Sequence, residues 1–143
     1  MIPSGREWHP ASAASATALA DLRSVAPARL PATYLELLAF SNGGEGPLPV
    51  APFNLCLYSA EDVIEIEREC SYREFFPGLF VIGGSGGGEA IALDVRGAEP
   101  WPVVYFDTTN IDLQESVQPL APDFDSFITM IGLAGASSGS FTG

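Results

Sequence analysis

Ser85 is the first candidate for chemistry, because it lies inside a glycine run. Residues 83–87 read G-G-S-G-G, which matches the pattern of a strained strand-to-helix turn that presents a serine nucleophile to a histidine base. That arrangement needs a helix directly after the serine, whereas residues 89–95 alternate apolar and polar side chains, as a strand does. The single histidine, His9, precedes the serine instead of following it. The pattern therefore argues against a serine hydrolase.

The same glycine run is a weak candidate for a phosphate-binding loop. A dinucleotide-binding fingerprint that starts at Gly84 needs a third glycine where Glu89 stands, and a helix after it. A P-loop needs a lysine, and the sequence has none. We therefore interpret the run as a connection between two strands, in which glycine permits a tight turn.

Metal ligands and paired carboxylates are also poorly supported. Residues 107–115 gather the oxygen ligands that calcium prefers, but they lack the spacing and the central glycine of an EF-hand loop. One histidine and the separated Cys56 and Cys70 do not readily complete a zinc site. Nothing singles out a carboxylate pair for acid and base catalysis. The sequence predicts no cofactor and no metal, and it favours free, buried thiols over a disulfide.

Length and charge limit the class of protein. A chain of 143 residues is the size of one domain, and it contains no apolar run long enough to cross a membrane. Residues 11–20 make a poor signal peptide, so we expect a cytoplasmic protein. The formal net charge of −12 repels nucleic acid and attracts a basic protein partner, although it could equally serve only to keep the protein soluble.

The elements that position these residues follow from hydrophobic spacing and turn signals. The predicted helices are residues 15–26, a helix that begins at Leu30-Pro31 and ends at Asn42-Gly43-Gly44, a helix after Ser59 and residues 123–131. The predicted strands are residues 54–58, 79–82, 89–95 and 103–106, and residues 45–53, with three prolines, are predicted to be an extended loop. Short connections between successive strands predict an antiparallel meander. We expect Trp8 and Trp101 at the edge of the core, and Glu61, Glu65, Glu67 and Glu69 on the exposed face of the third helix, opposite Val63, Ile66 and Cys70.

Several of these residues resemble a known family. Leu30-Pro31, Tyr34, Leu37-Leu38 and Asn42-Gly43-Gly44 are similar to the LP-x-x-Y-x-x-LL-x-x-x-NGG signature of SUKH-superfamily domains, the Smi/Knr type. The later segments agree in order and bring the resemblance to about residues 15–131. These segments are Ile82-Gly83, Gly86 to Glu89, Ile91 to Asp94, Val103 through Asp107, and the helix with Phe124 and Phe127.

The resemblance implies an α+β domain with a mainly antiparallel sheet packed by helices, and no catalytic machinery. It implies one domain over residues 1–131, followed by a Gly/Ser-rich tail at residues 132–143 that we expect to be mobile. Bacterial members resemble immunity proteins that neutralise toxins, many of them nucleases, whereas eukaryotic relatives act as regulatory scaffolds. The shared residues would serve the fold: Leu30, Pro31, Tyr34, Asn42, Gly43, Gly44 and Gly88, together with Glu89 and Asp94.

The leading hypothesis is a cytoplasmic immunity protein, a monomer or weak homodimer, that binds a cognate toxin with a basic surface. A regulatory or scaffold module without a toxin partner is the alternative, and a hydrolase that uses Ser85 or a carboxylate ranks last. The candidate partner-binding residues are acidic: Glu45, Glu89, Asp94, Asp107 and Asp112.

Overall fold

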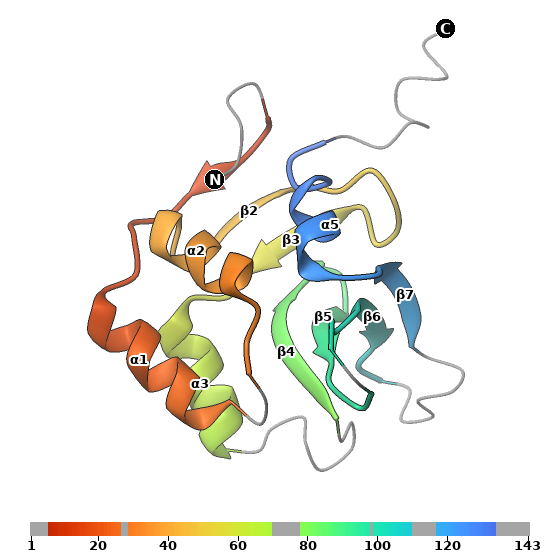
Figure 1. Ribbon diagram of the computed structural model, residues 1–143. Coiled ribbons are helices and arrows are strands. Elements are labelled where there is room, and N and C mark those ends of the chain that lie inside the picture. The colour runs from red at the N-terminus through yellow and green to blue at the C-terminus, as the bar shows by residue number, and fades with distance from the viewer. Residues whose placement is uncertain (1–5, 27–28, 70–77, 98, 110–116, 134–143) are drawn as a thin grey trace, which may run out of the picture.

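The computed structural model describes residues 6–26, 29–69, 78–97, 99–109 and 117–133. Over these residues the chain is an α+β domain, as predicted (Figure 1). The strands are β1 (His9–Pro10), β2 (Gly44–Pro47), β3 (Asn54–Leu57), β4 (Leu79–Gly84), β5 (Glu89–Asp94), β6 (Val103–Asp107) and β7 (Gln118–Ala121). The helices are α1 (Ala16–Val25), α2 (Ala32–Phe40), α3 (Ala60–Glu69) and α5 (Phe124–Ile128).

The strands form one sheet in the order β1 to β7, and each strand is antiparallel to the next. The predicted meander is therefore confirmed, and it extends at both edges beyond the predicted strands. The sequence pattern missed β1 because it is only two residues long, and missed β7 because it contains Pro119. Proline lacks the N–H that a central strand needs, but it is tolerated in an edge strand.

The extended loop predicted for residues 45–53 is partly wrong. Residues Gly44–Pro47 form β2, which pairs with β3 as a hairpin, with Glu45 opposite Cys56. Pro47 is the last residue of β2, where its missing N–H costs little, and the other prolines fall in the turn that follows. The three prolines therefore suggested a loop for the whole segment, although its first residues form a short strand.

The helix boundaries agree with the sequence signals at most ends. Ser15 caps α1, since its hydroxyl accepts from the Ala18 N–H at 3.0 Å. Ser59 caps α3 in the same way, through the Asp62 N–H at 3.1 Å. The last helix is shorter than predicted, because α5 ends at Ile128 and the chain continues in tight turns.

The assignment of the α3 faces was wrong in part. The helix buries Ala60, Val63, Ile64 and Glu67, and it leaves Ile66 only half-buried. Glu67 lies one helical turn after Val63, on the same face. Cys70, which was predicted to be buried with Val63, lies outside the described residues, and Cys56 is half-buried.

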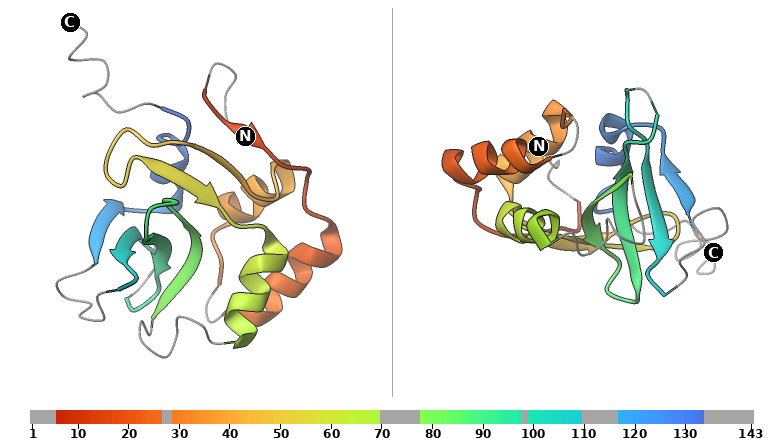
Figure 2. Two further views of the ribbon diagram at one scale, coloured as in Figure 1. Left: turned by 180° about the vertical axis from the view of Figure 1, so that it is seen from behind. Right: turned by 90° about the horizontal axis from the view of Figure 1, so that it is seen from below.

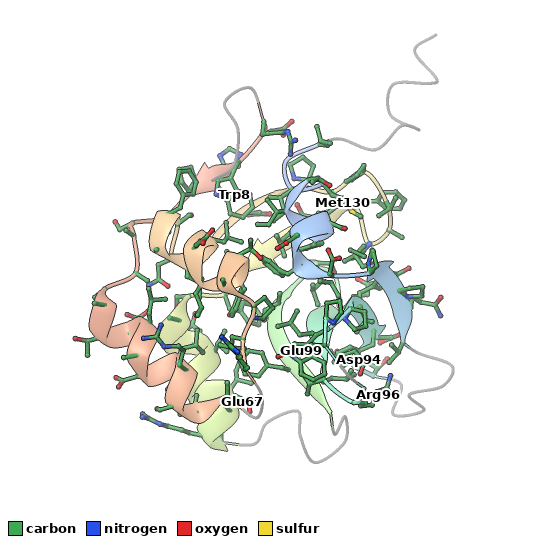
Figure 3. All side chains as sticks on the ribbon, in the orientation of Figure 1. Trp8, Glu67, Asp94, Arg96, Glu99 and Met130 are labelled. Atoms are coloured by element: carbon green, nitrogen blue, oxygen red, sulfur yellow. The ribbon has the colours of Figure 1, made fainter. Side chains whose placement is uncertain are left out.

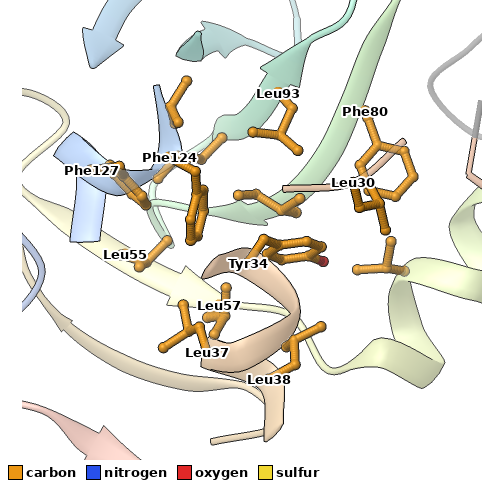
Figure 4. Close-up of a cluster of buried hydrophobic side chains, with 14 of the residues drawn as sticks. Leu30, Tyr34, Leu37, Leu38, Leu55, Leu57, Phe80, Leu93, Phe124 and Phe127 are labelled. Atoms are coloured by element: carbon orange, nitrogen blue, oxygen red, sulfur yellow. The ribbon is translucent and has the colours of Figure 1, made fainter. Parts of the chain in front are cut away.

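The main core lies between the sheet and the helices (Figure 2). Tyr34 of α2 sits at its centre, with its ring edge-on to Phe124 of α5 at a centroid distance of 5.4 Å (Figure 4). A second buried cluster includes Val81, Ala92 and Phe106, which belong to three adjacent strands. Trp8 and Trp101 are partly buried against the main core, which confirms their predicted place at its edge.

The remaining signature residues connect the end of α2 to α3. The Asn42 side chain accepts from the Ala60 N–H at 2.7 Å and donates to Glu61 Oε1 at 2.8 Å, so it caps the start of α3 from a distance. Gly43 and Gly44 have φ values of +104° and +129°, which side chains rarely adopt. A Cβ at Gly44 would also collide with the Trp8 ring. Gly43 and Gly44 therefore determine the path of the chain from the end of α2 into β2.

Candidate functional site

The meander brings three separate segments to one end of the sheet. Pro47 pairs with Asn54 next to the β2–β3 turn, and Glu89 pairs with Asp107 next to the glycine loop, residues 85–88. Cys56 pairs with Gly84, so the turn and the loop lie at the same end of neighbouring strands. We call this region the acidic end, because it holds the carboxylates of Glu45, Glu89 and Asp107.

Asn54 connects the hairpin to the glycine loop. Its side-chain amide donates to Glu45 Oε2 at 3.2 Å and to the Ser85 carbonyl oxygen at 2.9 Å. Gly86 lies against this amide, and a Cβ there would be 3.8 Å from Asn54 Nδ2. The Asn54 amide therefore fixes the position of the Glu45 carboxylate on β2 relative to the loop that follows β4.

Ser85 closes the glycine loop. Its hydroxyl donates to Glu89 Oε1 at 2.5 Å and accepts from the Gly87 N–H at 3.0 Å. Gly86 and Gly88 have positive φ values of +84° and +105°, and β5 follows directly. The predicted strand connection is confirmed but is shorter than the glycine run, because Gly83 and Gly84 belong to β4. The serine hydroxyl holds the remaining loop in place through these hydrogen bonds.

Gly88 and Asp107 connect this loop to the neighbouring strand. The Gly88 carbonyl accepts from both the N–H and the hydroxyl of Thr108, at 3.2 and 3.0 Å. The Thr109 hydroxyl donates to Asp107 Oδ1 at 2.7 Å, and this hydrogen bond lowers the pKa of the Asp107 carboxyl. Asp107 is thus an exposed carboxylate that stays ionised at neutral pH.

The charge at the acidic end is open to a partner. Glu45 is exposed and Glu89 is half-buried, and neither forms an ion pair with any described residue. Burial and the neighbouring Glu45 carboxylate raise the pKa of the Cys56 thiol. A thiol with a raised pKa is a poor nucleophile. This end of the sheet therefore offers negative charge, not a reactive group.

Asp94, a further partner candidate, does not lie at this end. Asp94 is the last residue of β5 and so lies at the other end of that strand from Glu89. There the Arg96 guanidinium donates to both Asp94 carboxylate oxygens at 2.8 Å (Figure 3). These hydrogen bonds lower the pKa of the Asp94 carboxyl, and the guanidinium neutralises its charge. Asp112 lies outside the described residues.

A groove of about 910 Å³ opens where α2 and α5 begin. Arg23 and Arg29 line it together with Asp123 and Asp125, so it carries both signs of charge. The indole N–H of Trp101 donates to the Arg29 carbonyl at 3.1 Å across this region. The sequence did not predict this groove, because its lining comes from four segments that only the fold brings together.

Two further features of the acidic end escaped the sequence reasoning. Asn54 appeared only as the first residue of a strand, although it joins two segments there. Val50 and Phe53, in the β2–β3 turn, are 43% and 55% exposed. The prolines around them signalled a turn, but no pattern in the sequence showed that an aromatic side chain would be left in solvent.

The described residues hold no cluster of three or more His, Cys, Asp or Glu side chains placed to bind a metal ion. Among the same residues, no helix combines the length and the apolar character needed to cross a bilayer.

The fold is an α+β domain of the SUKH type, an antiparallel meander covered by helices. The signature residues Leu30, Tyr34 and Gly43 are buried in it, and Asn42 is hydrogen-bonded to the start of α3. The family model of the SMI1 / KNR4 family (SUKH-1) matches residues 13–130, and the chain belongs to this family. A comparison with curated protein sequences finds no matching relative.

Proposed function

We propose that this protein is an immunity protein that binds a cognate bacterial toxin and neutralises it without catalysis. Membership of the SUKH family, whose bacterial members resemble immunity proteins, carries this proposal. The charge supports it, because the formal net charge is −12 and two carboxylates at the acidic end lack a cationic partner among the described residues.

A toxin that cleaves nucleic acid suits this surface. Its active site must attract phosphate groups and is therefore basic. Glu45, Glu89 and Asp107 would face that basic surface and exclude the substrate from it. Complementary charge raises the rate of association more than it raises affinity, and it loses reach as salt screens the field.

The contacts of Ser85 support the non-enzymatic part of the proposal. A serine nucleophile needs a base that removes its proton and a donor pair aimed at the substrate. The Ser85 hydroxyl donates to Glu89 at the start of β5, and it accepts from the Gly87 N–H, so this N–H points at the serine itself and is not aimed at a substrate. The proposed role of both residues is to hold the shape of the acidic end.

Co-expression tests the proposal directly. The effector domain encoded next to this gene should arrest growth, and this protein should restore growth and co-purify with the effector in a fixed ratio. If it does neither, the immunity role is wrong for that pair. Purification of another cellular protein in its place, with no toxin gene nearby, would favour the regulatory or scaffold alternative.

Salt dependence tests the part played by charge. Because screening shortens the reach of steering, association should slow by about tenfold between low and high ionic strength. Stopped-flow mixing with the purified effector measures this rate. A rate indifferent to salt would reject the electrostatic argument while leaving neutralisation intact.

A further inference from the structure

The β2–β3 turn leaves large apolar side chains in solvent. Val50 is 43% exposed and Phe53 is 55% exposed. Leu133, which is 40% exposed, follows Gly132, whose N–H donates to the Pro47 carbonyl at 2.9 Å at the base of the same hairpin. Of the four large hydrophobic side chains that are exposed among the described residues, two therefore lie in this turn, and a third follows a residue that is hydrogen-bonded to Pro47.

Folding does not explain the presence of Phe53 in this turn. Its φ is +69°, in the left-handed region where Gly and Asn are common and a bulky residue is an outlier. The exposed ring gains little from burial, so it offers no compensation for this backbone strain. Strained residues with no structural benefit concentrate at functional sites.

The turn is nevertheless held firmly. The Phe53 N–H donates to the Val50 carbonyl at 2.8 Å, and the Leu48 N–H donates to the Phe53 carbonyl at 3.0 Å. Leu48 itself is fully buried and anchors the turn in the core. A partner would therefore meet an aromatic side chain on an ordered backbone, which reduces the entropy lost on binding.

We propose that Val50 and Phe53, here called the hydrophobic tip, form the hot spot that enters an apolar pocket beside the basic surface of the toxin. This inference rests on the proposed function. Phe53 directly precedes Asn54, whose amide holds the Glu45 carboxylate at 3.2 Å. The tip thus lies next to the Glu45 carboxylate, which forms no ion pair with any residue that the structure describes. An aromatic anchor with a charged rim fits a basic protein that has an apolar pocket.

Two substitutions at Phe53 and one matched control test the tip. The probe is the purified effector domain encoded by the neighbouring gene. Phe53→Ala should weaken binding about 30-fold, mainly through faster dissociation. Phe40→Ala should change binding less than about twofold, because Phe40 is 43% exposed but lies before β2, at the opposite end of that strand from the tip.

Phe53→Gly separates binding from stability. Glycine adopts a positive φ freely, so this variant should unfold at the same temperature as the wild type or at a higher one. It should bind the effector as weakly as Phe53→Ala does. A variant that is more stable and yet binds less well supports a role for the ring in recognition.

Several outcomes would overturn the inference. If Phe53→Ala binds within about threefold of the wild type, the tip is not the hot spot, although wild-type binding would leave the immunity role intact. If Phe53→Ala abolishes self-association of the free protein and leaves effector binding unchanged, a second copy is the occupant. If the wild type does not bind the effector at all, the proposed function fails and the inference fails with it.

Discussion

Tyr34 and Phe53 show how differently two regions of this domain use an aromatic side chain. The Tyr34 side chain of α2 is fully buried and packs against Phe124 of α5. Phe53, in contrast, is 55% exposed in a turn, where its own φ is positive. Tyr34 belongs to the signature by which the family is identified, and Phe53 does not.

The same division holds for the polar residues. The Asn42 side chain forms its hydrogen bonds with the start of α3, whereas the Asn54 side chain binds Glu45 and the glycine loop at the acidic end. Tyr34 and Asn42, which identify the family, thus maintain the fold, whereas Glu45, Phe53 and Asn54, which we expect to act in recognition, are not among the residues that resemble the family. Glu89 belongs to both groups, because it is shared with the family and also carries charge at the acidic end. A family match alone therefore does not locate the binding surface.

The largest effect should come from Tyr34→Ala. Removing a fully buried aromatic ring leaves a cavity, and we expect a loss of about 3–5 kcal/mol in the free energy of unfolding. Urea denaturation measures this loss. Tyr34→Phe is the control: the hydroxyl has no hydrogen-bond partner among the described residues, so its removal should leave stability unchanged or raise it. A large loss for Tyr34→Phe would show that the hydroxyl contributes to the fold.

Tyr34 should also make stability fall in alkali. Burial raises the pKa of its hydroxyl above the ordinary value of 10.0. Above about pH 10 the unfolded chain releases this proton while the folded chain keeps it, so stability should fall by about 1.4 kcal/mol per pH unit. Tyr34→Phe lacks this contribution. Equal slopes for both proteins between about pH 10 and 11 would contradict the burial of a neutral hydroxyl.

Asn42→Ala should have a smaller effect. It leaves the N–H of buried Ala60 without its acceptor and should cost about 1–2 kcal/mol. Effector binding per folded molecule should remain unchanged, because Asn42 lies in the signature region. Urea midpoints measure the loss of stability, and binding stoichiometry measures the fraction of folded protein that binds the effector. Weaker binding by fully folded Asn42→Ala would contradict the claim that the signature residues serve the fold alone.

The smallest effect should come from Asp94→Asn. In its ion pair with Arg96, the Arg96 side chain is 45% exposed and the Asp94 side chain is 16% exposed, so solvent screens the pair in part and removal should cost about 1 kcal/mol at pH 7. Since Arg96 lowers the pKa of the folded carboxyl, this stability is present above about pH 4 and is lost as the pH falls further. Urea midpoints of variant and wild type should therefore converge in acid. A constant difference at all pH values would exclude the ion pair as its cause.

Much of the fold could be predicted from the sequence. The ends of α1 and α2 and the start of α3 follow local capping and turn residues. Alternation predicts β5, and short apolar runs predict β4 and β6, so each of these elements is encoded by a few neighbouring positions. The hairpin of β2 and β3 was harder, because pairing across the sheet stabilises a segment whose own composition suggests a loop. Glu67 was misplaced because acidic character outweighed its position one turn after Val63.

The candidate site was less predictable than the fold. The sequence named Glu45, Glu89 and Asp107, but also Asp94, because it shows where carboxylates are and not which arginine neutralises them. Strand direction decides the difference: Glu89 and Asp94 lie at opposite ends of β5, and only Asp94 has Arg96 within reach. The exposure of Phe53 depends on tertiary packing, to which no local pattern corresponds.

The most direct test of the acidic end compares two double variants by their rate of association with the effector. Glu45→Gln with Glu89→Gln removes two charges from the acidic end. Glu36→Gln with Glu65→Gln removes two charges from exposed positions on α2 and α3. At low salt the first should associate about tenfold more slowly than the wild type and the second less than about twofold more slowly, with both differences vanishing at high salt. Equal slowing by both variants would contradict the claim that the acidic end is the surface that meets the partner.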